Sequence, residues 1–194
     1  RSCRALTFPT TPQFNSRPIT SNISYTQSTA VNLKEQTRSL GGQRWEVSLG
    51  YPPMRPETFA PIWAYLLSKQ NGESFAITLP KLSKQFSTAT GTVTIDGNYA
   101  AGSSTVGVSV SGTLKAGDYI KFSNHDKVYC ITGDRVSSGS LSIYPSLRTA
   151  VSSTHTIKYN NVPIQMKLKN PMLKPYSPTL DNVIQYSFDI VEAV

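Results

Sequence analysis

The stretch YPPMRPETFAPIWAYLLSKQNGESFAITLP, residues Tyr51–Pro80, contains the one pattern in this chain that predicts a helix. Its apolar side chains Phe59, Ile62, Trp63 and Leu66 are spaced so that all four share one helix face. A helix with one apolar face buries that face against another element of the fold. We therefore predict a short helix that packs on a sheet.

The expected ends of this helix follow from its prolines and its glycine. Pro56 suits the first helical turn, where a missing N–H costs nothing, and Asn71–Gly72 is typical of a helix end. Pro61 falls inside the pattern, where a proline ring clashes with the carbonyl four residues earlier. The helix is therefore expected either to begin near Pro61 or to kink there.

Alternating segments flank the helix on both sides. QRWEVSLGY, residues 43–51, alternates before it, and ESFAITLP, residues 73–80, alternates after it. Each pattern predicts a strand with one buried face. Before the first strand, the polar residues 31–40 end in Gly41–Gly42, which we interpret as a turn. The core side chains predicted from this block are Trp45, Phe59, Trp63, Leu66 and Phe75.

Residues 91–159 change the character of the chain. Six short alternating runs are separated there by Gly, Asn, Asp and Ser, at intervals that predict a small barrel or sandwich. The side chains expected to face its interior are Val93, Ile95, Val106, Val108, Val110, Ile120, Phe122, Val128, Cys130, Leu141, Ile143, Ile157 and Tyr159.

Alternation of the first kind returns near the end of the chain. Residues 162–168 and 184–190 alternate, and we expect them to pair with the strands that flank the helix. The predicted fold is mainly β with one helix. A split β-sheet core with a packed helix comprises residues 1–83 and 160–194, and a small OB-like barrel is inserted at residues 84–159.

Composition narrows the functional classes. The chain has 194 residues and a formal net charge of +8, but no run of five or six basic residues marks a nucleic-acid tail. Two cysteines form neither a disulfide framework nor a metal cluster. No segment carries the roughly 20 consecutive apolar residues that span a bilayer, so no membrane partner is predicted.

The search for chemistry yields a negative prediction. The sequence contains no G-x-S-x-G, P-loop, G-x-G-x-x-G or H-E-x-x-H motif. His125, Asp126 and Cys130 lie close together, but they read better as a polar hairpin turn before a strand than as a catalytic set. We predict no catalytic residue, no cofactor and no metal site. The candidate outward contacts are instead loop residues, namely Asn98, Asn124, His125, Asp126 and Gly139.

Two binding functions remain as alternatives from the barrel itself. A basic barrel can bind single-stranded nucleic acid through stacked aromatics and a cationic groove. The side chains that would do so are Tyr119, Tyr129, Tyr144, Lys115, Lys121, Lys127 and Arg135. A carbohydrate-binding adhesin is the other alternative.

RWEVSLGYPPMRPETFAPIWAYLLSKQNGESFAITLP, residues 44–80, resembles the N-terminal core of the distal tail proteins of long-tailed, siphovirus-type bacteriophages. Residues 162–194 are similar to the closing strands of that core. One branch of the family carries an OB-type barrel, to which residues 84–159 correspond by architecture. The residues that carry the resemblance are Trp45, Tyr51, Pro52, Phe59, Trp63, Leu66, Gly72, Phe75 and Pro80.

The resemblance implies a non-enzymatic structural role in the virion tail, assembled in the host bacterial cytoplasm. Such proteins form a ring of six at the distal end of the tail tube, connect the tube to the baseplate or tail tip, and leave a channel through which DNA passes without specific binding. The implied partners are further copies of the chain and the proteins of tube, hub and side fibres. A tail-tube subunit or another minor tail protein is the nearest alternative. Because cationic walls would hold phosphates, we expect the positive charge to lie outside the channel or to meet acidic neighbours.

Overall fold

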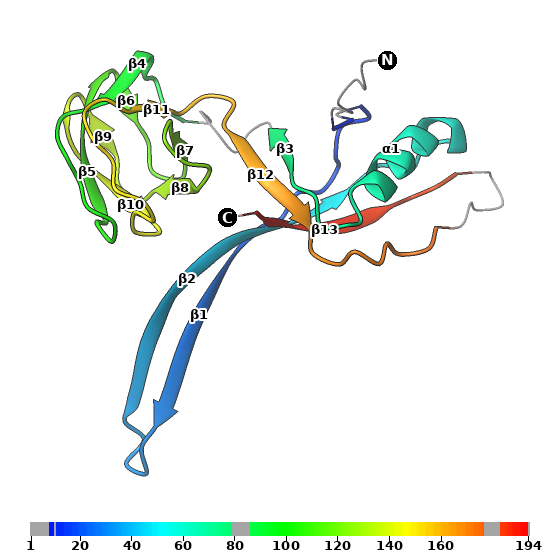
Figure 1. The fold of residues 1–194 in the computed structure, drawn as a ribbon, viewed down its shortest axis with the longest axis horizontal. Helices are drawn as coiled ribbons and strands as arrows, with labels where there is room; N and C mark the ends of the chain where they lie inside the picture. The colour runs from blue at the N-terminus through cyan, green and yellow to red at the C-terminus, as the bar shows by residue number, and fades with distance from the viewer. Residues whose placement is uncertain (1–7, 10, 79–85, 177–182, 194) are drawn as a thin grey trace. The chain divides into compact units, whose positions relative to one another are not determined.

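The computed structural model describes residues 8–9, 11–78, 86–176 and 183–193 (Figure 1). The chain forms two compact units. One comprises the described residues up to Ala76 together with Met166–Ala193, and the other comprises those of Ile77–Gln165. The predicted fold class is confirmed, because the described residues are mainly β-strand and include one helix.

The first unit is built on a five-stranded sheet with the order β1-β2-β13-β12-β3, of which β3 and β12 run across the boundary with the second unit. As expected, the last strand of the chain pairs with the strand before the helix, with Phe188 opposite Leu49 and Ile190 opposite Val47. The strands are β1 (Ile19–Thr29), β2 (Glu35–Gly50), β3 (Phe75–Thr78), β12 (Pro163–Leu168) and β13 (Ser187–Glu192).

The helix α1 (Pro56–Ser68) packs its apolar face on this sheet. Its buried side chains are Phe59, Ile62, Tyr65 and Leu66. Tyr65 thus takes the place predicted for Trp63, because its ring meets Phe75 of β3 edge-on at a centroid distance of 5.8 Å. Trp63 is only half-buried and packs against Tyr186, 5.7 Å away, at the margin of the same aromatic cluster.

The helix includes Pro61 and does not begin at it. Phe59 donates its N–H to Arg55 O at 3.1 Å, so the helical bonds start at the first turn. Pro61 removes one later bond, to the carbonyl of Glu57. Both residues are exposed, so water can satisfy that carbonyl.

The prediction of a turn at Gly41–Gly42 is wrong. Strand β2 continues through both glycines, and the chain reverses earlier, at residues 30–34. The register of β1 against β2 shifts between Ile23 and Tyr25, opposite the glycines. Gly41 has φ +78°, so the pair supplies the unusual backbone of a β-bulge and not that of a turn.

The second unit is a closed antiparallel barrel with the order β10-β5-β4-β11-β7-β8. These six strands fall on the six runs predicted from the sequence. The strands are β4 (Thr90–Ile95), β5 (Thr105–Ser111), β7 (Tyr119–Phe122), β8 (Val128–Ile131), β10 (Gly139–Tyr144) and β11 (Thr156–Lys158), and the short β6 (Thr113–Leu114) and β9 (Arg135–Val136) form a separate pair. The barrel core contains Val93, Val106, Ile120, Phe122, Leu141 and Ile157 among its buried side chains.

In one barrel strand, the side chain that enters the core is not the predicted one. In β8 the ring of Tyr129 is fully buried in the core, whereas Cys130 is half-buried and lies outside the core cluster. A tyrosine can be buried when its hydroxyl finds polar partners. Tyr129 has two, His125 Nε2 at 2.8 Å and the N–H of Arg148 at 3.0 Å.

The chain enters and leaves the barrel side by side. The first strand, β4, pairs antiparallel with the last, β11, with Val93 opposite Ile157. The hydroxyl of Tyr159 lies 3.2 Å from Ala89 O and 2.9 Å from Gly91 O, which ties the exit to the entry. Whether domain boundaries fall at residues 83/84 and 159/160 stays a prediction.

Candidate interaction surfaces

The outer part of the β1–β2 hairpin, residues 23–42, is exposed along its whole length, and we call it the arm (Figure 1). In the ribbon, β1 and β2 run well past the strand β13 that pairs with the base of β2. The arm has no second layer among the described residues of its unit. The sequence analysis missed it, because the glycine pair was interpreted as a turn.

One face of the arm continues the buried face of the sheet. Residues directly opposite in an antiparallel pair share a face. Val47 and Trp45, on the core face, are buried, and the next residue of β2 on that face, Gln43, is paired with Ile23. Farther out on the same face of β1, the side chain of Tyr25 is 52% exposed. The core-facing side of β1 and β2 therefore continues beyond the part of the sheet that is buried.

The tip of the arm is apolar and tightly turned. Leu33 donates its N–H to Ala30 O at 2.9 Å, and Ala30 donates to Lys34 O at 3.0 Å. Leu33 has φ +62°, an uncommon backbone conformation for a side chain of this type. Val31 is fully exposed and Leu33 is 85% exposed. Two aliphatic side chains are thus held in water at the end of a defined turn.

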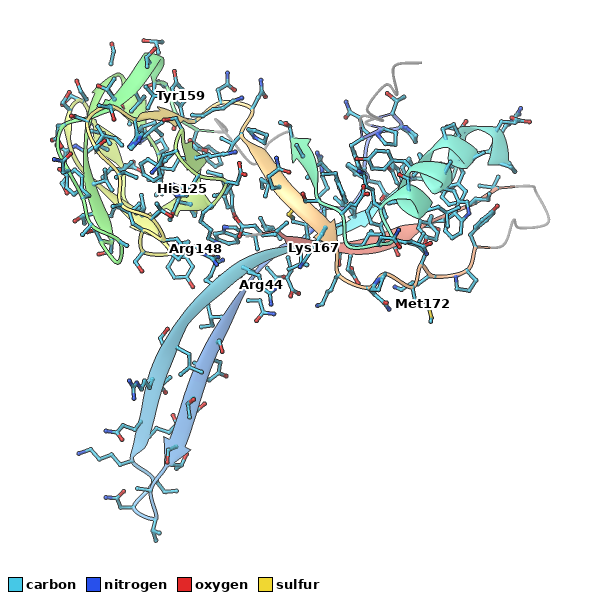
Figure 2. All side chains as sticks on the ribbon, in the orientation of Figure 1. Arg44, His125, Arg148, Tyr159, Lys167 and Met172 are labelled. Carbon is cyan, nitrogen blue, oxygen red and sulfur yellow. The ribbon has the colours of Figure 1, made fainter. Side chains whose placement is uncertain are left out.

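A second apolar surface of the same unit lies beside the segment that follows β12. A hollow of about 350 Å³ is open there, which we call the hollow. Its apolar walls come from Leu168, Met172, Leu173, Tyr186 and Phe188, and its polar residues are Lys169, Asn170, Lys174 and Asp189. Met172 is 79% exposed and points away from the ribbon in Figure 2. The hydroxyl of Tyr186 donates to Lys174 O at 3.0 Å, which fixes the segment across the sheet.

The predicted outward loop residues of the barrel differ in exposure. Asn98 and Asp126 are exposed, while Asn124 and His125 are half-buried. Gly139 does not lie in a loop; it opens strand β10 opposite Val108. The structure therefore brings together Asn124, His125 and Asp126, and leaves Asn98 and Gly139 elsewhere on the barrel.

His125 is a packed part of the barrel wall (Figure 2). Its Nε2 lies 2.8 Å from the Tyr129 hydroxyl, and its Nδ1 lies 2.7 Å from Asn124 Oδ1. An amide oxygen only accepts, so Nδ1 carries the proton and Nε2 accepts from Tyr129. Burial lowers the pKa of His125 below its usual 6.5, and the positive charge of Lys121 adds to this, against the opposing effect of Asp126. The imidazole is therefore neutral and structural.

The surface beside His125 is a shallow polar depression of about 470 Å³. Lys121, Asp126, Thr156 and Lys158 contribute to it, and Lys121 forms an ion pair with Asp126. Asn124 Nδ2 donates to Ala150 O at 2.9 Å and joins this loop to the one before β11. Lys121, Asp126 and Asn124 in this depression thus already have partners within the barrel.

The pattern proposed for nucleic-acid binding does not form a surface. Tyr129 and Lys127 are buried, and burial also raises the pKa of Tyr119 to about 12. Of the three tyrosines expected to stack on bases, only Tyr144 is exposed, at 38%. The prediction failed because β8 has the opposite face inward, and because Lys127 lies in the turn that leads into it.

Neither thiol nor metal chemistry is indicated in the part of the chain that the structure describes. Cys130 is a free thiol whose pKa is raised, mainly by burial, so the reactive thiolate is disfavoured. Among the described residues, no group of three or more His, Cys, Asp or Glu side chains is placed to hold a metal ion. The one described helix is too short to cross a membrane.

Comparison with known proteins finds a family that resembles the barrel. Residues 86–162 match the family described as "Distal tail protein pb9, B domain". The barrel is similar to this B domain. Over 164 residues the chain is also 29% identical to distal tail protein pb9 of Escherichia phage T5, covering 80% of this chain and 78% of that protein. The resemblance to distal tail proteins inferred from the sequence is confirmed.

The two comparisons cover more than the barrel. The matched B domain contains all six strands of the barrel, from β4 to β11. The 164 residues aligned with pb9 are about twice the length of that domain, so they also include residues of the sheet-and-helix unit. The similarity to pb9 therefore extends beyond the barrel into the sheet-and-helix unit, which also carries the arm.

Proposed function

We propose that this chain is a structural subunit of a phage tail, located at the distal end of the tail tube. The observation that carries this proposal is the similarity to distal tail protein pb9 across most of both chains. A structural role is consistent with His125, whose two ring nitrogens already have partners in the barrel, and with Cys130, whose raised pKa disfavours the thiolate. We therefore assign no enzymatic activity to the chain.

In this proposal the sheet-and-helix unit forms a closed ring of six copies around a channel for DNA. The sheet shapes the ring, the helix α1 shields its outer face, and the barrel is an inserted domain directed toward other tail proteins. The barrel loops at Asn98, Asn124 and Asp126 are the proposed contacts with tube, hub or fibre proteins. Closure of such a ring requires a head-to-tail interface, in which each copy presents two different surfaces.

The net charge of +8 is proposed to lie away from the channel wall. Part of the charge is already compensated within the chain, since Lys169 forms an ion pair with Glu46 at 2.6 Å and Lys115 with Asp134 at 2.6 Å. Phosphates passing a cationic wall would be retained, with an affinity that falls steeply as salt rises.

The test is native mass spectrometry of the purified chain, with negative-stain images at high protein concentration. The expected result is a closed ring of about six copies with a central hole. Binding of single-stranded nucleic acid to the protein is measured in parallel across salt concentrations. Tight, salt-sensitive binding by a chain that never assembles would overturn the structural role.

A further inference from the structure

We propose that the arm of one copy inserts its tip into the hollow of the next copy, and that this contact builds the ring. The inference rests on the proposed function and names its interface. It assigns Val31 and Leu33 as the inserted side chains, and Met172 as part of the wall that receives them.

The arm itself requires a partner. An isolated two-stranded hairpin is marginally stable in water, and stability comes from a third strand or from packing on an apolar face. The arm has neither among the described residues of its unit, although its inner face carries Ile23 and Tyr25, and its tip carries Val31 and Leu33. Its base is fixed in the five-stranded sheet, so the tip is presented in a defined direction.

The hollow suits the tip in size and chemistry. Its 350 Å³ equals the space of about twelve liquid water molecules at roughly 30 Å³ each, which is enough for two aliphatic side chains. Its floor is apolar, because Tyr186 and Phe188 belong to the buried face of the sheet. Filling it would remove the exposed side chain of Met172 and both tip side chains from water at once.

The charges on the two surfaces also match. Lys34 and Glu35 follow the tip directly, so the end of the arm carries one charge of each sign. Around the hollow, Asp189 and Lys174 are exposed and carry opposite charges, while Lys169 is already paired with Glu46. Lys34 can therefore meet Asp189 while Glu35 meets Lys174.

A second copy is the occupant that these surfaces favour. The tip and the hollow are two different, non-overlapping surfaces of one unit, and each copy presents both. A contact between unlike surfaces of identical subunits is head-to-tail, and it closes into a ring when the rotation per copy permits. A single kind of contact thus covers the arm of every copy, as a symmetric ring requires.

The experiment uses two full-length variants that each disable one side. The arm variant carries Val31→Asp and Leu33→Asp, and the hollow variant carries Met172→Asp. All three residues are exposed, so the fold of each copy is retained. Val136→Asp, at a residue of the barrel that is 66% exposed, is the matched control. Assembly is followed by analytical ultracentrifugation and native mass spectrometry.

Each variant alone is expected to lose assembly, with the midpoint concentration raised by roughly 30-fold or more, as for loss of a central interface side chain. The control is expected to assemble like the unmodified chain. An equimolar mixture of the two variants is expected to give a dimer and nothing larger, because each copy then retains one intact side. This pairing is specific to a head-to-tail contact.

Other results would distinguish failure of the arm–hollow contact from failure of the ring. If the unmodified chain assembles and the arm variant assembles equally well, the arm–hollow contact is wrong while the ring stands. If the mixed variants remain monomeric, the arm binds a surface other than the hollow, and the assignment is overturned. If the unmodified chain is monomeric at all concentrations and its arm is protected from proteases, the arm packs on its own chain, and both ring and contact fail.

Discussion

The barrel is built from shorter strands than the arm, yet the barrel is closed and the arm is not. In the barrel, six strands close on themselves, and its inward side chains are removed from water. Strands β1 and β2 pair through ten registered positions, but those in the arm have no second layer among the described residues of the unit. Main-chain pairing therefore does not by itself make a stable strand pair; the burial of side chains does.

The first way to test this comparison is to remove buried volume from the barrel. Leu141 of β10 is fully buried in the core cluster. Leu141→Ala is expected to lower the free energy of unfolding of the barrel by about 2–5 kcal/mol, through lost burial and the cavity that remains. Urea unfolding, combined with hydrogen exchange of the β5 and β10 amides, measures the change. A loss below 1 kcal/mol would mean that the barrel core is loosely packed.

A smaller but distinct loss is expected from the barrel backbone. Gly112 has φ +97°, and a Cβ added there would lie 2.7 Å from Thr88 O. Gly112→Ala is therefore strained by its backbone and by a contact with main chain that cannot move aside, and about 1–3 kcal/mol of stability should be lost. Gly133→Ala, where an added Cβ meets nothing within 4 Å, is the control and should leave the urea midpoint nearly unchanged.

The stability of the barrel should also fall at acidic pH. Because burial lowers the pKa of His125 in the folded chain, the unfolded chain binds the proton more readily. The stability contributed by neutral His125 is thus full above pH 6.5 and is lost as the pH falls through the lower folded pKa. Protonation would also remove the acceptor of the Tyr129 hydroxyl. The urea midpoint of the barrel should fall between pH 7 and pH 5, and less so in His125→Gln; equal pH profiles would contradict this role.

The smallest effect on stability is expected in the arm. Leu33→Ala makes the same change as Leu141→Ala, but Leu33 is 85% exposed. The isolated chain should lose less than about 0.5 kcal/mol, since no buried contact is removed. Measured at a concentration too low for assembly, the pair Leu33→Ala and Leu141→Ala compares the two regions directly. A loss of 2 kcal/mol at Leu33 would show that the tip is covered within its own chain.

The sequence predicted the periodic parts of the fold well, because each strand of the barrel buries one face and so alternates. The helix was also predictable from its spacing. Its buried side chains Phe59, Ile62 and Leu66 were predicted as well, but Tyr65 was not. Tyr65 and Trp63 are both large and aromatic, and only the position of Phe75 favours Tyr65. The inward face of β8 was missed for a related reason: Tyr129 is buried through partners for its hydroxyl that lie in other segments.

The arm was the largest omission, and its cause is specific. Gly41–Gly42 is a common turn signal, but a glycine with positive φ serves a bulge equally well. A strand pair that lacks a core in its own unit also shows little alternation, so residues 23–42 gave no periodic pattern to detect. Strands without a second layer in their own unit are thus the parts of a chain that its own periodicity describes least.

The link between Tyr159 and the entry strand has a consequence for how such chains diversify. Since the hydroxyl of Tyr159 bridges Ala89 O and Gly91 O, the barrel begins and ends at a single point. Genetic exchange can therefore remove, replace or enlarge the whole barrel with two nearby cuts, while the carrier keeps its sheet and helix. Such an exchange would change the barrel without altering the sheet-and-helix unit.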